Sequence, residues 1–272
     1  MTDATDAGFR ALMDKITRDR GFRCSSYKDK CLRRRVAVRM RAKGAATYSD
    51  YADILDADTH EYDRLHRVLT INVTKFFRNW ETYAVLEQRV IPQLWDRGAS
   101  GTRIWSAGCA SGEEAYSLAI LMHQHAAATD SLKRLDSVSI VGTDIDGHCV
   151  GDAERALYSE MALGETPQAL RARYFPTDAG MRTVLPEVKR LVAFEQADIL
   201  QAPPPLDPVH LILCRNVIIY FQRDAQESLL RDFHRILAPG GFLVLGRVET
   251  LLGNIRGLFS PVNARERVFR KL

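Results

Sequence analysis

Hydrophobic and polar positions follow two different patterns along this chain, and the pattern changes near residue 100. Residues 9–70 are rich in helix formers and contain no Pro, and Gly21 and Gly44 mark the natural breaks. From about residue 103 onward, short apolar runs alternate with helical segments. We therefore predict a small all-helical domain at 1–72, followed by a domain at 73–272 built on an open, mostly parallel α/β sheet.

Six apolar runs are the candidate strands of this sheet. They are TRIWSA (102–107), SVSIVGTD (137–144), LVAFEQAD (191–198), VHLILC (209–214), GFLVLG (241–246) and ERVFRKL (266–272). Between residues 163 and 192 the alternation loosens, and we expect a small inserted β-lobe at about 172–196. The Pro-rich run at 199–208 is expected to be an extended loop without a chemical role.

The first candidate strand leads into a glycine-containing loop and then an amphipathic helix. Gly108 and Gly112 allow a ligand to approach the backbone closely, and Glu113 and Glu114 stand where the helix begins. Two carboxylates would repel a pyrophosphate, whereas they suit a ligand that carries positive charge, such as the amino and sulfonium groups of S-adenosylmethionine (SAM). Two glycines before a helix also occur in ordinary βα turns, and this alternative stays open on the loop alone.

Polar side chains follow the later candidate strands at the edge where ligands bind in such sheets. Asp144 is placed to accept hydrogen bonds from both hydroxyls of a ribose. Asp198 is placed to accept from an adenine amino group, with Ile199 offering its backbone N–H and an apolar contact. Arg215 and Asn216 end a buried strand and need polar partners there, because an unpaired buried polar group costs about 1–3 kcal/mol. Helix or turn caps are the alternative for the two aspartates.

Composition excludes several classes of protein. A chain of 272 residues with 46% apolar side chains can form one large or two modest globular domains. It has no uncharged apolar run of 18 residues and no N-terminal signal pattern, so neither a membrane span nor export is indicated. The five cysteines form no CxxC pair and their odd number favours reduced thiols, so we expect a cytoplasmic protein. The seven His residues show no metal-ligand spacing, and no metal site is predicted.

The net charge of +4 is modest, but the basic residues are concentrated in one segment. Residues 28–43 hold eight Lys or Arg against the single acid Asp29, while Leu32, Val36 and Met40 form an apolar stripe at i, i+4 spacing. This pattern predicts a helix with one packed side and one basic side, which is either a solvated face or a docking surface for an acidic partner. No RNA-recognition or helix-turn-helix signature accompanies it, which argues against nucleic acid.

Five motifs occur in order along the chain: INVTKFFRNW (71–80), RIWSAGCASGEEAYSLAI (103–120), GTDID (142–146), LCRNVIIYF (213–221) and APGGFLVLG (238–246). Together they resemble the chemotaxis receptor methyltransferases of the CheR type. The basic segment that begins YKDKCLRRR is similar to the N-terminal helical domain of that family, so the resemblance covers nearly the whole chain.

The resemblance implies a Rossmann-like, class I SAM-dependent methyltransferase domain, with a small N-terminal all-helical domain and a small inserted β-lobe. The cofactor would be SAM and its product S-adenosylhomocysteine. The implied enzyme is a protein-glutamate O-methyltransferase, which methylates glutamate side chains of methyl-accepting chemoreceptors in chemotaxis adaptation or related signal transduction.

The resemblance also implies three groups of site residues. Arg78 and Tyr220 would stand beside the transferring methyl group. The acidic cytoplasmic helical bundle of a receptor would dock on Arg33, Arg34, Arg35 and Arg39. The SAM site, with Gly108 added from the loop described above, would be lined by Asn72, Thr74, Arg78, Gly108, Glu114, Asp144, Asp198, Ile199, Arg215 and Asn216.

Three features depart from the usual pattern of the family. Arg247 and Val248 replace the middle pair of a Gly-His-Ser-Glu motif, and Ala115 stands where Pro is usual. The segment 178–185 looks short compared with forms that capture a receptor's C-terminal peptide tether, which argues against tether binding. These departures leave one alternative, a catalytically weak SAM-binding scaffold or sensor. The basic helix leaves another, an RNA methyltransferase that uses the same cofactor pocket and binds phosphate with this helix.

Overall fold

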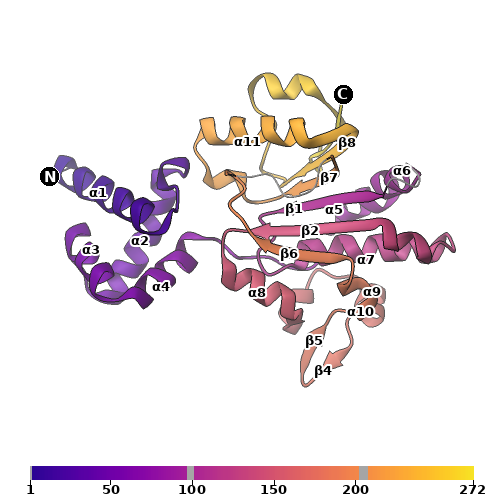
Figure 1. Cartoon of the computed structure of the whole chain (residues 1–272), viewed down its shortest axis with the longest axis horizontal. Helices are drawn as coiled ribbons and strands as arrows, with labels where there is room; N and C mark the ends of the chain where they lie inside the picture. The colour runs from indigo at the N-terminus through magenta and orange to yellow at the C-terminus, as the bar shows by residue number, and fades with distance from the viewer. Residues whose placement is uncertain (1, 97–100, 202–207) are drawn as a thin grey trace. The chain divides into compact units, whose positions relative to one another are not determined.

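The computed structural model describes residues 2–96, 101–201 and 208–272, and the chain divides into two compact units (Figure 1). One unit comprises Met1–Ile71 and Tyr220–Gln226, and the other comprises Asn72–Ile219 and Glu227–Leu272. Most of the Pro-rich loop expected at 199–208 lies outside the described residues.

The N-terminal unit is helical, as the sequence predicts. Its elements are α1 (Thr2–Arg20), the short 3-10 helix η1 (Cys24–Ser26), α2 (Asp29–Lys43), α3 (Tyr48–Ala57) and α4 (Thr59–Leu69). Gly44 ends α2 in the left-handed conformation, with φ +69°, which glycine adopts without strain. Thr47 and Asp50 then form a reciprocal capping box at the start of α3. Local sequence therefore sets where these helices begin and end.

Leu32 and Val36 of the apolar stripe of α2 are buried in this unit, while Met40 is partly buried. All four α-helices contribute to the core. Its fully or nearly fully buried side chains include Phe9, Leu12 and Ile16 of α1, Leu32 and Val36 of α2, Tyr51 and Leu55 of α3, and Leu65 and Leu69 of α4.

The second unit is built on a seven-stranded sheet with the order β6-β2-β1-β7-β8-β10-β9. The first five strands in this order are parallel, and β10 and β9 are antiparallel to their neighbours. The bounds are β1 (Thr102–Ala107), β2 (Val138–Asp144), β6 (Val192–Gln196), β7 (Val209–Cys214), β8 (Leu237–Leu245), β9 (Phe259–Asn263) and β10 (Val268–Lys271). All six predicted strands are present, so the prediction of a mostly parallel α/β sheet is confirmed.

Strand β9 was not predicted from the sequence. Its sequence FSPVN is short and contains Pro261, and it lies at the edge of the sheet. Proline lacks a backbone donor and is tolerated on an edge strand, but it hides the strand from pattern recognition.

Helices cover both faces of the sheet, and in Figure 1 α11 lies on one side with α7 and α8 on the other. Helix α7 is buried over most of its length. The helical elements that follow residue 79 are α5 (Trp80–Val85), the π-helical turn η2 (Leu86–Val90), α6 (Ile91–Trp95), α7 (Glu113–Ala128), η3 (Leu132–Ser137), α8 (Gly147–Arg155), η4 (Glu160–Leu163), α9 (Gln168–Tyr174), α10 (Pro186–Lys189), η5 (Ile218–Tyr220), α11 (Arg223–Ile236) and η6 (Gly253–Leu258). The end of η5 and the start of α11 belong to the N-terminal unit.

A second, three-stranded sheet with the order β3-β5-β4 forms the expected small lobe, but its bounds differ from 172–196. It begins earlier, at β3 (Leu157–Tyr158), and continues with β4 (Thr177–Asp178) and β5 (Met181–Thr183). Residues 192–196 do not belong to it, because they form β6 and pair with β2 in the large sheet. The run 191–198 is predicted as a strand of the large sheet and also overlaps the expected lobe, and its pairing with β2 assigns it to the large sheet alone.

Strand β1 lies between β2 and β7, where the order of the parallel strands reverses. In open α/β sheets this switch point opens a crevice at the carboxyl ends of the strands. The loops that follow β1, β2 and β7 therefore meet where a ligand is expected. Among the described residues, no helix is both long and apolar enough to cross a membrane.

Candidate functional site

The loop between β1 and α7 packs too closely against its neighbours to accept a side chain at two positions. Gly108 has φ +79°, and a Cβ atom there would lie 2.6 Å from a methyl group of Val217 in the loop after β7. Gly112 has φ +93°, and its Cβ would lie 2.8 Å from the Cβ of Ala153. Both glycines are therefore required by the fold as well as by any ligand that the loop holds.

Asp144, at the end of β2, fixes this loop through its carboxylate. One oxygen accepts the backbone N–H of Ala110 at 2.9 Å, and the other accepts that of Asp146 at 3.0 Å. Burial raises the pKa of Asp144, although these backbone donors oppose the shift. A carboxylate has about four acceptor positions, so these contacts leave room for a hydrogen bond from the ribose expected from the sequence.

Asn72 lies beside this strand end. Its amide donates to the carboxylate of Asp146 at 2.7 Å, and Asp146 also caps α8 by accepting the N–H of His148. Thr74 lies two residues further along the same segment and is partly buried. The structure thus brings the first predicted cofactor residue next to the end of β2.

A buried ion pair connects α7 with the end of β7. Glu114 accepts a hydrogen bond from Ser106 at 2.8 Å, and its other oxygen lies 3.6 Å from the guanidinium of Arg215. Burial raises the pKa of Glu114, and the positive charge of Arg215 opposes the shift. Because both side chains are almost entirely buried, their charges act in a medium of low polarity, where they are stronger than in water.

Arg215 also holds the segment that carries Arg78. Its second terminal nitrogen donates to the carbonyl of Arg78 at 2.8 Å and to the side-chain oxygen of Asn79 at 3.2 Å. Phe77 and Asn79 on either side of Arg78 have φ +53° and +60°. Asn adopts this conformation readily, but Phe77 stores strain in it, and such strain persists where surrounding contacts over-determine the backbone, as at binding sites.

The side chain of Arg78 itself remains near the chain that precedes it. One guanidinium nitrogen donates to the carbonyl of Val73 at 3.0 Å. A guanidinium has five N–H donors and this contact uses one, so Arg78 retains donors for a carboxylate.

Glu249 is a site residue that sequence reasoning noted only as part of an altered motif. It is buried, and its carboxylate accepts backbone N–H groups from Gly246 at 2.5 Å, Asn216 at 3.0 Å and Val217 at 2.9 Å. It therefore fixes the loop after β7 from the end of β8. The sequence signal was that Glu249 is retained although Arg247 and Val248 are replaced.

Asp198 and Ile199 follow β6 close to the end of β2, because the backbone N–H of Ala197 donates to the carbonyl of Asp144 at 2.9 Å. The carboxylate of Asp198 accepts the N–H of Leu200 and the side-chain amide of Gln201, both at 2.9 Å, so it closes a tight turn. The structure thus shows Asp198 in the capping role that the sequence left open as an alternative, and its carboxylate still has acceptor positions for an adenine amino group.

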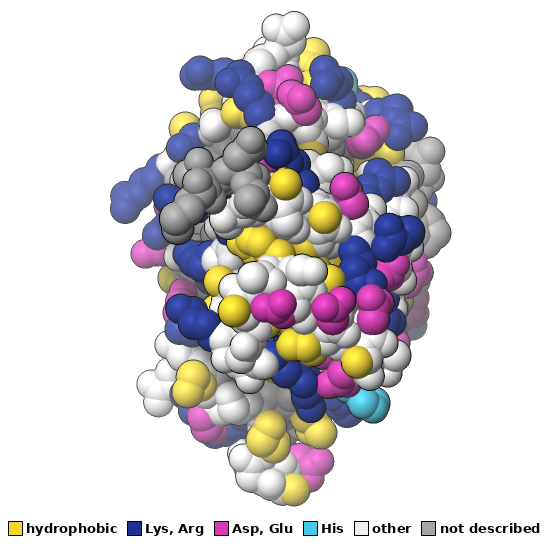
Figure 2. Space-filling view, turned by 90° about the vertical axis from the view of Figure 1, so that its left-hand side faces the viewer, with side chains coloured by type: hydrophobic (Ala, Val, Ile, Leu, Met, Phe, Trp, Pro, Cys, Tyr) yellow, Lys and Arg dark blue, Asp and Glu magenta, His cyan; other side chains and the backbone are white. Residues whose placement is uncertain are grey.

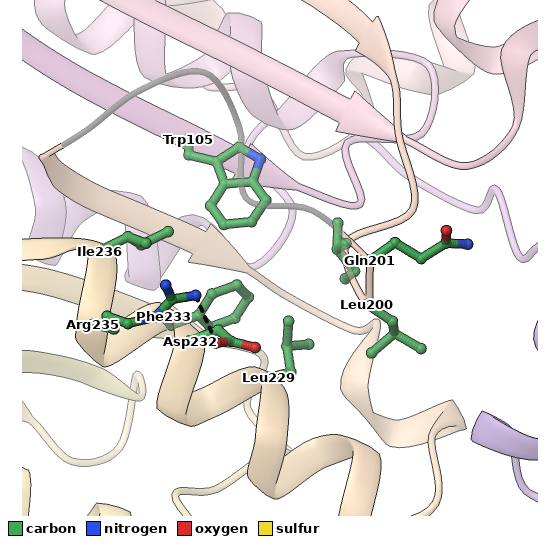
Figure 3. Close-up of a pocket in the computed structure, with 9 residues that line it drawn as sticks. Trp105, Leu200, Gln201, Leu229, Asp232, Phe233, Arg235 and Ile236 are labelled. Atoms are coloured by element: carbon green, nitrogen blue, oxygen red, sulfur yellow. Dashed lines mark hydrogen bonds and ion pairs between the residues drawn. The ribbon is translucent and has the colours of Figure 1, made fainter.

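Ile199 lines a cavity of about 60 Å³ between β1, this turn and α11 (Figure 3). Trp105 and the buried side chains of Leu229 and Phe233 form its apolar wall. A water molecule occupies about 30 Å³ of liquid, whereas ligand sites span roughly 300–1,000 Å³, so this cavity is too small to be the whole cofactor site.

Two polar atoms at the end of β7 are consistent with a ligand there. Within the described residues, Nε of Arg215 and Oδ1 of Asn216 are buried and have no hydrogen-bond partner. Such groups are costly unless something satisfies them. A donor and an acceptor at this strand end, with Arg215 paired to the carboxylate of Glu114, fit a ligand that has both a carboxylate and cationic groups, as SAM does.

Comparison with known proteins decides the family. Residues 72–268 match the CheR methyltransferase SAM binding domain, and residues 7–70 match the CheR methyltransferase all-alpha domain. The chain belongs to the CheR methyltransferase family. The resemblance drawn from the motifs is confirmed, and so are the class I methyltransferase fold and S-adenosylmethionine as the cofactor.

Three relatives illustrate the range of similarity. The chain is 31% identical over 237 residues to the chemotaxis protein methyltransferase of Listeria innocua, covering 87% of each chain. It is 34% identical over 187 residues to chemotaxis protein methyltransferase 1 of Pseudomonas aeruginosa, covering 67% of this chain and 68% of that one. It is also 34% identical over 248 residues to an uncharacterized 104.1 kDa protein of Rhodobacter capsulatus, and this match covers 90% of this chain but only 26% of the larger protein.

The departure at Arg247 has a structural explanation. Its guanidinium bonds to the buried carboxylate of Glu266 at 3.0 and 3.1 Å and to Glu81 at 2.7 Å. Glu266 also accepts a hydrogen bond from Thr82 at 2.8 Å. Arg247 therefore fastens the end of β8 to the first turn of α5, just after the Arg78 segment, while neighbouring Val248 is 75% exposed.

The four predicted docking arginines of α2 differ in their surroundings. Arg39 forms two hydrogen bonds, at 2.8 and 2.7 Å, with the carboxylate of Glu61, which is 0% exposed. Arg33 pairs with Asp6 at 2.8 Å and lies over the ring of Phe9.

The remaining two docking arginines differ in exposure, since Arg35 is partly buried and Arg34 is exposed. Arg35 donates to backbone carbonyls at the end of α4, whereas Arg34 is exposed. Three of the four arginines therefore stabilise their own unit.

Tyr220 belongs to the N-terminal unit and not to the unit that contains the large sheet. The structure thus brings one group of predicted site residues to the switch point of the second unit: Asn72, Arg78, Glu114, Asp144, Arg215 and Asn216. Tyr220 belongs to the other unit, which also contains α2.

Proposed function

We propose that this chain transfers a methyl group from SAM to glutamate side chains of methyl-accepting chemoreceptors. Its family makes it a SAM-dependent methyltransferase, and the proposal concerns the acceptor. Relatives about 30% identical over most of the chain are chemotaxis protein methyltransferases by name, which supports a receptor of that pathway.

An uneven distribution of charge supports an acidic protein acceptor. Residues 1–71 hold 15 of the 38 basic and 11 of the 34 acidic side chains, so they account for the entire net charge of +4. On α2 the exposed residues Lys30, Arg34, Val38 and Arg41 recur at spacings of three or four, which places them along one side of the helix.

This narrow stripe suits the side of an acidic helical bundle, because Val38, which is 44% exposed, adds an apolar contact among the charges. Figure 2 shows a face on which Lys and Arg side chains lie among Asp and Glu side chains, so this face is not uniformly basic. Charge attraction of this kind raises the rate of encounter and weakens as salt is added.

The chemistry required of the protein is limited. A glutamate carboxylate is already a nucleophile, so no general base is needed. Bound SAM supplies an electrophilic methyl group: the new oxygen–carbon bond forms as the sulfur–carbon bond breaks, and the electron pair of that bond remains on sulfur. The protein has to align the acceptor oxygen with the methyl group and remove water from the attacking carboxylate.

In this proposal Arg78 and Tyr220 contact the acceptor carboxylate. Arg78 orients it through its remaining guanidinium donors, and the hydroxyl of Tyr220 donates one further hydrogen bond. Glu114 places negative charge where the cationic groups of SAM bind, and Asp144 accepts hydrogen bonds from its ribose hydroxyls. Arg215 neutralises part of the charge of Glu114 and holds the Arg78 segment in place.

The scaffold alternative rested on the replacement of the usual motif by Arg247 and Val248. Arg247 forms ion pairs with Glu266 and Glu81, and in this proposal its replacement of the usual residue leaves methyl transfer intact. No described feature favours RNA over protein as the acceptor.

The test is transfer of a labelled methyl group from SAM to a chemoreceptor cytoplasmic fragment, followed by release of the label in mild base, which cleaves methyl esters. We expect base-labile label with the wild-type chain and a loss of at least 100-fold with Arg78→Ala. The matched control is Arg231→Ala, which removes an exposed arginine from α11 of the same unit. Base-stable label, or equal transfer by the Arg78→Ala variant, would contradict the proposal.

A further inference from the structure

Residues Tyr220–Gln226 cluster with the N-terminal helical unit, although they follow β7 in sequence. The carbonyl of Tyr220 accepts the backbone N–H of Lys28 at 2.9 Å, directly before α2 begins. The rings of Tyr27 and Phe221 meet edge to face, with 5.0 Å between their centroids, and these two residues form an isolated β-bridge. The backbone of Tyr220 is therefore fixed to the start of α2.

The ring of Tyr220 has a second attachment to α2 through Arg35. The guanidinium carbon of Arg35 lies 5.6 Å from the centroid of that ring, within the range of a cation–π contact. The same guanidinium donates to the carbonyls of Val68 at 2.6 Å and Leu69 at 3.2 Å, at the end of α4. Since these carbonyls hold Arg35 in one place, Arg35 in turn restricts where the ring of Tyr220 can lie.

Arg34 gives the contrast on the same helix. It precedes Arg35 by one residue, or about 100° around the helix, and it is exposed. The two neighbouring arginines of α2 thus have different surroundings: one side chain reaches solvent, and the other lies between α4 and Tyr220.

We infer that Arg35 is a positioning residue, which holds the ring of Tyr220 so that its hydroxyl meets the acceptor carboxylate in the orientation for methyl transfer. The inference rests on the proposed function, because only there does Tyr220 contact the acceptor. It separates α2 into two roles: Arg34 belongs to the surface that binds the acceptor, and Arg35 acts on the transfer step through Tyr220.

The experiment is a double-mutant cycle measured as methyl transfer to the receptor fragment. Arg35→Gln should lower kcat about fivefold, which is about 1 kcal/mol at 1.4 kcal/mol per tenfold, and should leave the dissociation constant of SAM unchanged. Tyr220→Phe removes the hydroxyl but keeps the ring. If Arg35 acts by placing that hydroxyl, adding Arg35→Gln to Tyr220→Phe should lower kcat less than twofold further. Arg34→Gln should instead raise KM for the receptor fragment and leave kcat unchanged.

Urea unfolding of all variants separates a structural effect from a positioning effect. Loss of the bonds to Val68 and Leu69 should shift the unfolding midpoint equally with and without Tyr220→Phe, whereas the effect on kcat should differ between the two backgrounds. Should Arg35→Gln fail to fold, Arg35→Lys keeps a cation near the ring and should give an intermediate kcat.

Two results would overturn the inference while leaving the proposed function in place. One is the same fivefold loss of kcat in both backgrounds, and the other is a change confined to KM, as for Arg34→Gln. Absence of base-labile transfer by the wild-type chain would instead refute the proposed function, and the inference with it.

Discussion

Arg39 provides the sharpest test of whether the basic helix serves folding or docking. Its guanidinium forms two hydrogen bonds with Glu61, whose side chain is 0% exposed and also accepts the hydroxyl of Tyr51 at 2.8 Å. Replacing Arg39 by Met keeps most of the aliphatic volume and removes the charge. We expect the variant to lose stability in the N-terminal unit, because a buried carboxylate is left without its main partner.

The structure sets the size of this loss. Removing one partner of a buried ion pair costs about 3–5 kcal/mol. Tyr51 remains bonded to Glu61, and Lys43 lies 3.6 Å away, so we expect the lower end, about 3 kcal/mol. With an m-value of about 1–3 kcal/mol per molar urea, the unfolding midpoint should fall by roughly 1–3 M.

The assay is urea unfolding followed by circular dichroism, with Arg34→Met as the matched control. Arg34 is exposed, so its replacement should change the free energy of unfolding by no more than about 0.5 kcal/mol. The double variant Arg39→Met/Glu61→Leu should recover most of the lost stability, because an apolar pair of similar volume replaces the buried charges. An unchanged midpoint for Arg39→Met, accompanied by weaker binding of the receptor fragment, would refute this reasoning and return Arg39 to the docking surface.

Three further predictions concern acid stability and the cofactor loops. Burial alone would raise the pKa of Glu61, but hydrogen bonds from Arg39 and Tyr51 outweigh it and lower that pKa below 4.5. This carboxylate therefore stabilises the folded state above about pH 4.5, and the stabilisation is lost as the pH falls further. Between pH 7 and pH 3, urea unfolding should show a larger loss of folding free energy for the wild type than for Arg39→Met/Glu61→Leu, and equal losses would contradict the assignment. Glu249→Gln replaces one acceptor oxygen by an amide group that faces backbone donors. Calorimetry should therefore show about tenfold weaker SAM binding, a loss of about 1.4 kcal/mol. The control Glu195→Gln, at an exposed position of β6, should bind SAM as the wild type does. Gly108→Ala places a Cβ atom 2.6 Å from Val217 at φ +79°, whereas the Cβ of Gly180→Ala meets nothing within 4 Å at φ +81°. Both variants should lose about 1–2 kcal/mol of stability from backbone strain, but only Gly108→Ala should weaken SAM binding. Equal SAM affinities of the two variants would show that the loop adapts.

The sequence by itself determined the architecture and the family. Apolar runs of four to eight residues separated by helical segments predict a parallel sheet, because each strand of such a sheet is buried on both faces. The loop with Gly108 and the residues Asp144 and Arg215 at the strand ends could be assigned to one site, since the carboxyl ends of parallel strands meet at the same edge. These inferences depend on local patterns and on a general rule of topology.

The tertiary structure decided which partner each charged side chain has. The spacing of α2 shows that its arginines lie around one helix, but it does not show that Glu61 from α4 is buried against Arg39 or that the last carbonyls of α4 hold Arg35. Glu249 likewise gains its role from backbone donors more than thirty residues away. A charge acts through whatever lies within a few ångströms of it, and chain folding alone brings those groups together, so the roles of these residues follow from the structure and not from the sequence pattern.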